Sequence, residues 1–135
     1  MKVRNLCNAT VVGAGPEESL VEAATRMATH SVSSLAVLEA GRLVGIITER
    51  DMVNALSDGV TPQTAQVSAY MAVAPEVARL DEDSKDVAIR MLELGVRHLP
   101  VMDGEEVVGV ISARDLLMLQ AWPEPGPPVA PVRGA

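Results

Sequence analysis

The sequence has 135 residues, of which 48% are hydrophobic, and a formal net charge of −7. This length fits one compact domain or two very small ones, and the hydrophobic content excludes a disordered chain. The acidic balance disfavours nonspecific binding to nucleic acid or to an anionic membrane surface. A single cysteine, Cys7, excludes an internal disulfide and a cysteine-built metal site. The sequence shows neither a secretion signal nor an apolar run that would span a bilayer, so we expect a cytoplasmic protein.

The first half of the chain predicts a strand, a helix, a hairpin and a second helix. Pro16 suits the first position of a helix, and the apolar residues after it recur at helical spacing. Two apolar runs on either side of Gly41 predict the hairpin. The predicted elements are a helical turn within 1–10, a strand at Val11–Val12, a helix from Pro16 to about His30, strands at 35–38 and 43–47, and a helix from Thr48 to about Leu56.

The second half predicts the same order of elements. Gly95 suits the C-terminal cap of a helix, and Asp103–Gly104 suits a hairpin turn. The predicted elements are a segment at 67–71 resembling the one that opens the chain, a strand within 76–80, a helix at 83–94, strands at 97–102 and 107–111, and a helix from Ser112 to about Ala121. Five prolines beyond Trp122 predict an extended or disordered tail.

The two halves repeat one another at an offset of 64 residues, from Gly45 to Gly109. Each copy reads glycine, an apolar run, a hydroxyl residue, two variable positions and an aspartate. The match continues upstream without a gap, since 32–37 lies over 96–101. A shared period of this length indicates two copies of one supersecondary unit.

Each half therefore predicts a strand–helix–strand–strand–helix unit, and the fold class is α/β (α+β). We place repeat 1 in residues 1–60, repeat 2 in residues 61–121 and the Pro-rich tail in residues 122–135. A half of about 60 residues would be marginal alone, so we expect the halves to share one core.

The doubled motif, with Leu99-Pro100-Val101 in the strand before its second copy, resembles the cystathionine-β-synthase (CBS) domain. The resemblance covers about residues 1–121. It implies two repeats packed through their sheets about a pseudo-twofold axis, an arrangement called a Bateman module, with two clefts between them. In the family these clefts commonly bind adenosyl compounds, here AMP, ADP, ATP, NAD or S-adenosylmethionine. The layout is similar to that of stand-alone two-repeat proteins of actinobacteria, including hypoxia-responsive members.

The resemblance implies that ribose is bound by a hydroxyl residue and an aspartate at each strand-to-helix turn. These are Thr48 with Asp51, and Ser112 with Asp115. An ionised carboxylate accepts two hydrogen bonds from a vicinal diol, and the helix N-terminus beside it favours a phosphate. The same residues also fit a helix capping box that binds no ligand, and this alternative stays open.

Arg97 and His98 match the basic positions that reach phosphate in the family. Repeat 1 has Ser33 and Ser34 at these positions, so we expect the second cleft to bind phosphorylated ligands more tightly. The alternatives are that Arg97 is a solvated charge and that His98 packs on the core edge. The remaining expected contacts are Arg50 and Arg114 for phosphate, and Val77 and Ile111 for the base in the second cleft.

No enzyme is predicted, and no catalytic cofactor, because no nucleophile–base spacing and no metal-ligand cluster stands out. Gly13-Ala14-Gly15 fails as a dinucleotide fingerprint, since Glu18 occupies the third glycine position. We therefore expect a regulatory module that senses an adenosyl ligand and acts in trans on an unidentified effector protein. The alternative is a ligand-free dimeric interaction scaffold, while a nucleic-acid-binding protein is disfavoured by charge. Consecutive apolar residues at 116–119 predict a homodimer formed through helices.

Overall fold

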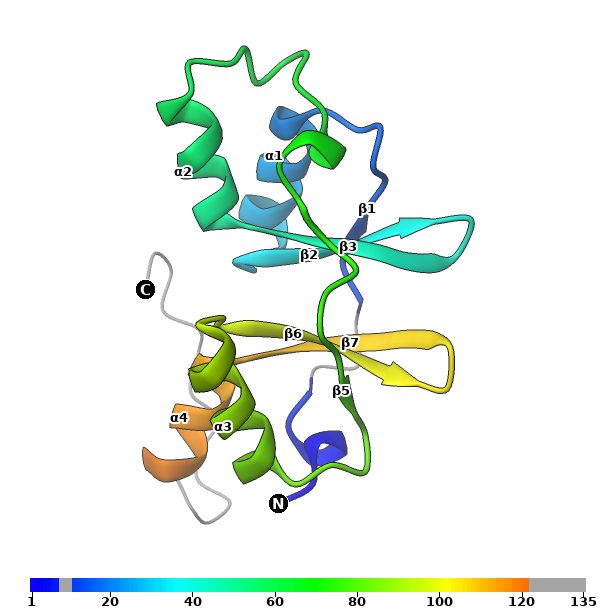
Figure 1. Cartoon of the computed structure of the whole chain (residues 1–135), viewed down its shortest axis with the longest axis vertical. Helices are drawn as coiled ribbons and strands as arrows, with labels where there is room; N and C mark the ends of the chain where they lie inside the picture. Colours follow the sequence, from blue (N-terminus) through cyan, green and yellow to red (C-terminus); the bar gives the residue numbers. More distant parts are fainter. Residues whose placement is uncertain (8–10, 122–135) are drawn as a thin grey trace.

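The structure, a computed structural model, describes residues 1–7 and 11–121, and the side chains up to Met118. Two β-sheets lie one above the other, and each carries two helices on its outer side (Figure 1). The predicted tail at 122–135 lies outside the described residues. The α+β fold with two similar halves is confirmed.

The elements follow the predicted order, with additions before each repeat. Repeat 1 contains β1 (Gly13–Ala14), α1 (Leu20–His30), β2 (Ser34–Glu39), β3 (Arg42–Thr48) and α2 (Glu49–Ser57). Repeat 2 contains β5 (Ala78–Arg79), α3 (Ser84–Leu94), β6 (His98–Asp103), β7 (Glu106–Ser112) and α4 (Ala113–Ala121). Two 3-10 turns, η1 (Val3–Asn5) and η2 (Val67–Ala69), and a short strand, β4 (Ala72–Val73), complete the described chain.

Two predicted boundaries in repeat 1 are wrong. The first strand is Gly13–Ala14 rather than Val11–Val12, because these two residues pair in parallel with the middle of β2. Helix α1 begins at Leu20 and not at Pro16, because the Ser19 side chain accepts a hydrogen bond from the Glu22 N–H and so caps the helix there. The predicted cap at Gly95 is confirmed, with φ of 69°.

The antiparallel strands of the two repeats pair in the same register at the 64-residue offset. The first has the order β1-β2-β3-β4 and the second β5-β6-β7. The antiparallel pair of each repeat carries a register shift at the same place, after Val37 and after Val101. Ala40 and Gly41 both have positive φ, 51° and 78°, which suits a two-residue hairpin turn of the primed type.

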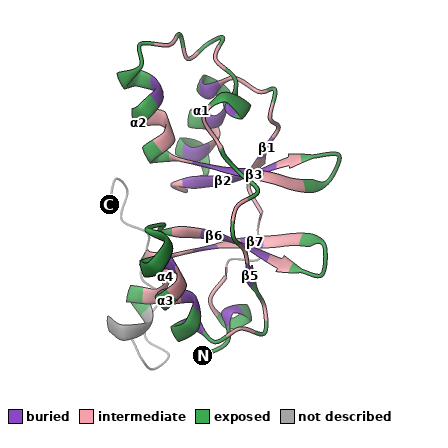
Figure 2. Cartoon of the chain, viewed as in Figure 1, coloured by how far each residue is buried: buried purple, intermediate pink, exposed green. Residues whose placement is uncertain are grey.

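Each repeat has its own hydrophobic core between its sheet and its helices (Figure 2). Each core is completed by the segment that precedes the other repeat. Val67 is buried in the first core, and its N–H donates to Glu18 O at 2.9 Å. Val3 is buried in the second core, and its N–H donates to Glu82 O at 3.0 Å. The division at residue 60 thus describes the sequence repeat, whereas each core draws on both sides of it.

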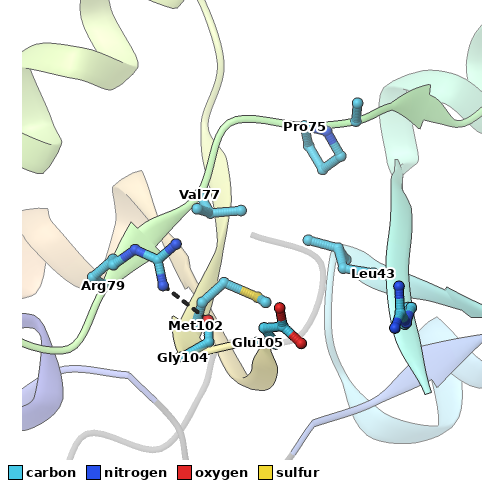
Figure 3. Close-up of a pocket in the computed structure, with 9 residues that line it drawn as sticks. Leu43, Pro75, Val77, Arg79, Met102, Gly104 and Glu105 are labelled. Carbon is cyan, nitrogen blue, oxygen red and sulfur yellow. Dashed lines mark hydrogen bonds between the residues drawn. The ribbon is translucent and has the colours of Figure 1, made fainter.

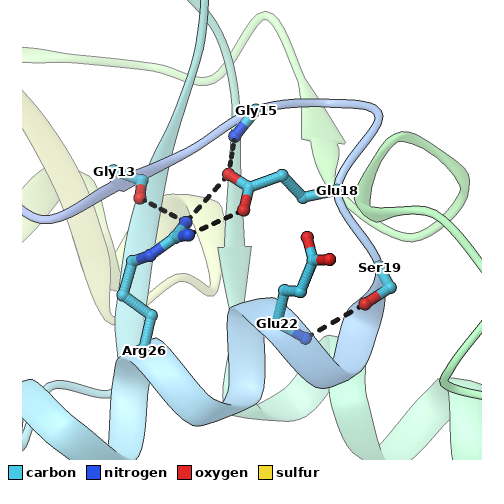
Figure 4. A network of polar contacts seen from close by, with 6 residues as sticks. All are labelled: Gly13, Gly15, Glu18, Ser19, Glu22 and Arg26. Atoms are coloured by element: carbon cyan, nitrogen blue, oxygen red, sulfur yellow. Dashed lines mark hydrogen bonds and ion pairs between the residues drawn. The ribbon is translucent and has the colours of Figure 1, made fainter.

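An ion pair repeated at the 64-residue offset fixes the first strand of each repeat against its helix. In repeat 1, the Arg26 guanidinium contacts both carboxylate oxygens of Glu18 at 2.6 and 2.8 Å and donates to Gly13 O at 2.9 Å (Figure 4). These Arg26 hydrogen bonds lower the pKa of Glu18 to about 2. In repeat 2, Arg90 pairs with Glu82 and donates to Val77 O at 2.6 Å. The network holds the segments that lead into β1 and β5.

Candidate ligand-binding site

Both predicted ribose motifs form helix capping boxes. In repeat 1, Asp51 Oδ2 accepts from the Thr48 N–H at 2.8 Å and from Thr48 Oγ1 at 3.1 Å. In repeat 2, Asp115 Oδ2 accepts from the Ser112 N–H at 2.8 Å, and Ser112 Oγ accepts from the Asp115 N–H at 3.2 Å. The strand therefore turns directly into the helix in both repeats, and the side chains that cap the helix are fixed in place.

Each capping box leaves part of its aspartate available. All bonds to the two carboxylates use Oδ2, and neither Oδ1 accepts a hydrogen bond from the described residues. Both aspartates are half-buried. Since a carboxylate offers about four acceptor positions, each can cap its helix and still accept hydrogen bonds from a hydroxylated ligand.

The backbone brings Arg97 and His98 to the second capping box. The Ala113 N–H, at the start of α4, donates to Arg97 O at 2.8 Å. His98 is the register partner of Ser112 in the β6–β7 ladder. The same connection exists in repeat 1, where the Glu49 N–H donates to Ser33 O at 3.1 Å. Four of the predicted site residues thus meet at one strand-to-helix corner, and Arg97 is exposed there.

His98 lies where the two repeats meet. Its Nε2 is 2.7 Å from Ser33 Oγ of the other repeat, a contact that the sequence did not predict. Burial, together with the adjacent charge of Arg97, lowers the pKa of His98, while Asp115 opposes the shift. A lowered pKa favours the neutral imidazole, so Arg97 carries the positive charge at this corner.

The other predicted contacts are dispersed. Arg50 and Arg114 are exposed within the first turns of α2 and α4. Ile111 is 0% exposed and belongs to the second core, so a ligand would reach its side chain only if that core opened. Val77 lines a groove whose other residues include none of the four capping-box residues. The proposed site therefore includes neither Ile111 nor Val77.

The groove at Val77 lies between the two hairpins and the segment that joins the repeats (Figure 3). Its volume is about 360 Å³. It is lined by Arg42, Leu43, Ala74, Pro75, Val77, Arg79, Met102, Gly104 and Glu105. No local sequence pattern predicts this groove, because its residues come from three separate segments.

The comparison with known families agrees with the fold. The CBS domain profile matches residues 3–58 and 67–121. The chain therefore belongs to the CBS domain family, and its two matched segments make it a CBS domain pair, which is a regulatory module. The predicted resemblance is confirmed.

Individual relatives match over most of this chain. An uncharacterized 17.7 kDa protein of Acidianus ambivalens is 35% identical over 117 residues, which cover 85% of this chain and 70% of that protein. Hypoxic response protein 1 of Mycobacterium tuberculosis is 29% identical and is covered to 80%, with 84% of this chain covered. Longer relatives match over a minor part, and the chain spans 22% of an inosine-5′-monophosphate dehydrogenase of Methanocaldococcus jannaschii.

A similar CBS domain pair has been solved with adenosyl ligands bound. The CBS domain pair of protein MJ0100 was crystallised in complex with 5′-methylthioadenosine and S-adenosyl-L-methionine. It superposes with a TM-score of 0.84 at 28% identity, covering 90% of this chain and 96% of that one.

Two absences hold for the residues that the structure describes. None of their helices has the length and apolar character needed to cross a bilayer. Within the same residues, no group of three or more His, Cys, Asp or Glu side chains is placed to hold a metal ion.

Proposed function

We propose that the chain is a non-catalytic regulatory module that binds an adenosyl ligand at its capping boxes and acts in trans on an effector protein. The ribose hydroxyls bind Asp51 with Thr48, and Asp115 with Ser112. Arg97 contacts the phosphate or other anionic group in the second cleft, with His98 as a neutral hydrogen-bonding partner. Arg50 and Arg114 approach the same group from the exposed first turns of their helices.

One observation carries this proposal: two equivalent aspartates stand 64 residues apart, each with Oδ2 bonded to the N–H of its capping residue, while Oδ1 accepts no hydrogen bond from the described residues. A fixed carboxylate loses little freedom on binding, which favours affinity. The MJ0100 pair, which is similar in fold and sequence, was crystallised with two adenosyl compounds, and this supports the ligand class.

A ligand screen tests the proposal. AMP, ADP, ATP, NAD, S-adenosylmethionine and 5′-methylthioadenosine are added to the full chain, and the melting temperature is measured with each. A ligand at 100 times its dissociation constant stabilises the folded state by about 2.7 kcal/mol. We expect at least one compound to raise the melting temperature in a saturable manner. No shift with any of them, together with no heat of binding, contradicts the proposal.

The charge of Arg97 predicts an asymmetry between ligands. Arg97→Ala should weaken AMP more than adenosine, because a charge-assisted hydrogen bond contributes about 1.5–3 kcal/mol, roughly one to two decades of affinity. Isothermal titration with both ligands measures the difference. Lys85→Ala is the control, because Lys85 is exposed at the start of α3. Arg79→Ala would not serve, because the Arg79 side chain donates a hydrogen bond to Gly104 O. Equal losses for AMP and adenosine show that Arg97 does not contact phosphate.

The alternative function is a dimeric scaffold that needs no ligand. Exposed apolar side chains on α2 and α4 favour it, among them Val53 and Leu117, which are 60% and 65% exposed. The two functions differ in one measurement, because a scaffold dimerises and binds its partner without any response to adenosyl compounds.

A further inference from the structure

The groove between the hairpins combines an aliphatic floor with charged groups of both signs. Leu43, Pro75, Val77 and Met102 supply the apolar surface. Figure 3 shows the labelled residues converging from β3, from the segment that runs into β5 and β5 itself, and from the β6–β7 hairpin. A volume of about 360 Å³ lies in the range of small-molecule sites. The floor contains no aromatic ring, so it suits an aliphatic group rather than a stacked base.

The charged side chains of the groove do not form ion pairs with one another in the described residues. Within the described residues, Glu105 forms no ion pair with Arg42 or Arg79, and the Arg42 guanidinium donates no hydrogen bond, although the Arg42 backbone pairs with Glu39 in the β2–β3 ladder. Arg79 donates from Nη1 to Gly104 O at 2.9 Å, which fixes its guanidinium at the groove wall and leaves its other donors open. The groove thus presents guanidinium donors and a carboxylate acceptor above one apolar surface.

We propose that this groove binds an α-amino acid with an aliphatic side chain. A guanidinium recognises the ligand carboxylate through a planar pair of hydrogen bonds, and Arg42 is the residue with all its donors available. The Glu105 carboxylate accepts from the ligand ammonium. The aliphatic side chain covers Leu43, Val77 and Met102. A simple fatty acid fits less well, because it leaves Glu105 facing an anion, and a simple amine leaves the arginines facing a cation.

This assignment is independent of the adenosyl site, because the groove contains no capping-box residue. It lies where both hairpins and the segment joining the repeats meet, so an occupant contacts both repeats at once. The consequence is a second small-molecule input to the module, of a different chemical class from the first.

The test uses three matched compounds and the full chain. L-Leucine has both charged groups, 4-methylpentanoate lacks the ammonium, and 3-methylbutylamine lacks the carboxylate. Titration followed by amide NMR shifts should show L-leucine binding at the hairpins, with the Gly104 amide among those that move. Each analogue should bind about tenfold more weakly, the loss of one charge-assisted contact.

Two variants assign the charged contacts. Arg42→Gln and Glu105→Gln should each weaken L-leucine about tenfold, and Glu105→Gln should also remove the preference for L-leucine over 4-methylpentanoate. Both residues are exposed, so neither change disturbs a core. Lys85→Gln and Glu93→Gln make the same charge changes on α3 and should leave binding unchanged. No binding at millimolar L-leucine overturns the proposal, as do equal affinities for the three compounds or shifts confined to the helices. Retained binding of an adenosyl ligand by a protein that fails this test shows that only the groove assignment is wrong.

Discussion

The aspartates at the two capping boxes have two roles that use different oxygen atoms. Oδ2 of Asp115 accepts from the Ser112 N–H, while Oδ1 accepts nothing from the described residues. Glutamate is the commoner residue at the third position of a capping box, and it reaches the same N–H with a longer side chain. Aspartate here therefore caps the helix while keeping its second oxygen in a retracted position. Lengthening this side chain by one methylene group should therefore separate its capping role from its role in ligand binding.

Asp115→Glu should keep the cap and lose the ligand. The longer side chain still accepts from the Ser112 N–H, so the melting temperature of the free protein should stay within about 2 °C of wild type. Its second oxygen moves into the space of the ribose and misplaces both acceptors, which should weaken an adenosyl ligand by about 1–3 kcal/mol. Thermal melts and isothermal titration measure the two effects separately.

A matched control for this change exists on α3. Asp86 stands at the third position of that helix and is exposed. Asp86→Glu makes the same chemical change without a proposed ligand nearby, so it should affect neither stability nor binding. Wild-type affinity in Asp115→Glu would mean that Asp115 only caps α4. Asp51→Glu repeats the experiment at the first box.

At this scale the sequence predicted local contacts better than distant ones. The hydroxyl–aspartate spacing of three residues is sufficient to predict each capping box. The Ser33–His98 contact joins residues of different repeats, and no local spacing encodes it. Ile111 was expected to contact the base because the family resemblance places adenine between apolar strand residues, but its side chain is buried in the second core. Successive side chains of a strand point to opposite faces of the sheet, but the sequence of an apolar strand does not show which face packs on the core.

Among the elements, the long ones were predicted, whereas the two-residue strands were predicted only in part: β5 lies within the expected 76–80, β1 is displaced from Val11–Val12, and β4 was missed. Helices α1 to α4 and the two hairpins have enough residues to show a period. Strand β4, which the sequence did not predict, has only Ala72 and Val73, and it exists because it pairs with Gly45 and Ile46 of β3. Short strands of this kind depend on the partner strand rather than on their own pattern.

Gly45 permits the close approach of β4. A Cβ at this position would lie 2.6 Å from Met71 Sδ and 2.8 Å from Ala72 O, and the second contact is with backbone. Gly45→Ala should therefore displace β4 and destabilise the fold by about 1–3 kcal/mol, as overpacking does. The melting temperature should fall by roughly 3–10 °C.

Gly15→Ala is the control for this substitution. Its Cβ would meet only Glu18 atoms at 3.7 Å, an ordinary contact. It should leave the melting temperature nearly unchanged. A Gly45→Ala protein as stable as Gly15→Ala would show that β4 is not held closely against β3.

At the scale of the whole molecule, the two repeats are joined by exchanged segments as well as by their sheets. Val3 packs in the core of repeat 2, and Val67 packs in the core of repeat 1. The sequence indicated that half a chain would be marginal alone, but it predicted one shared core instead of two cores with exchanged segments. Only three-dimensional packing distinguishes these solutions, because both bury the same apolar residues.

Helices α2 and α4 both carry exposed apolar side chains. Val53 and Leu117 are equivalent at the 64-residue offset and are 60% and 65% exposed. Leu56 is 67% exposed beside the first, and Met118 is 39% exposed beside the second. Figure 1 shows α2 and α4 each on the outer side of its own sheet, both at the end of the molecule away from the hairpins. These four residues form what we call the helix face.

We predict that the helix face joins two copies of the chain in a homodimer. Apolar side chains this exposed gain about 25 cal/mol for each Å² removed from water, and a twofold arrangement buries the same face on both copies. Light scattering at micromolar concentration should give twice the mass of one chain. Leu117→Glu places two charges in the interface, one from each copy, and should shift the mass to that of a monomer without changing the circular dichroism spectrum.

Val73→Glu makes the same change at a residue that is 71% exposed on β4, outside the helix face, and should leave the dimer intact. A wild-type monomer at these concentrations, or a Val73→Glu protein that dissociates as Leu117→Glu does, would contradict a dimer built through α2 and α4.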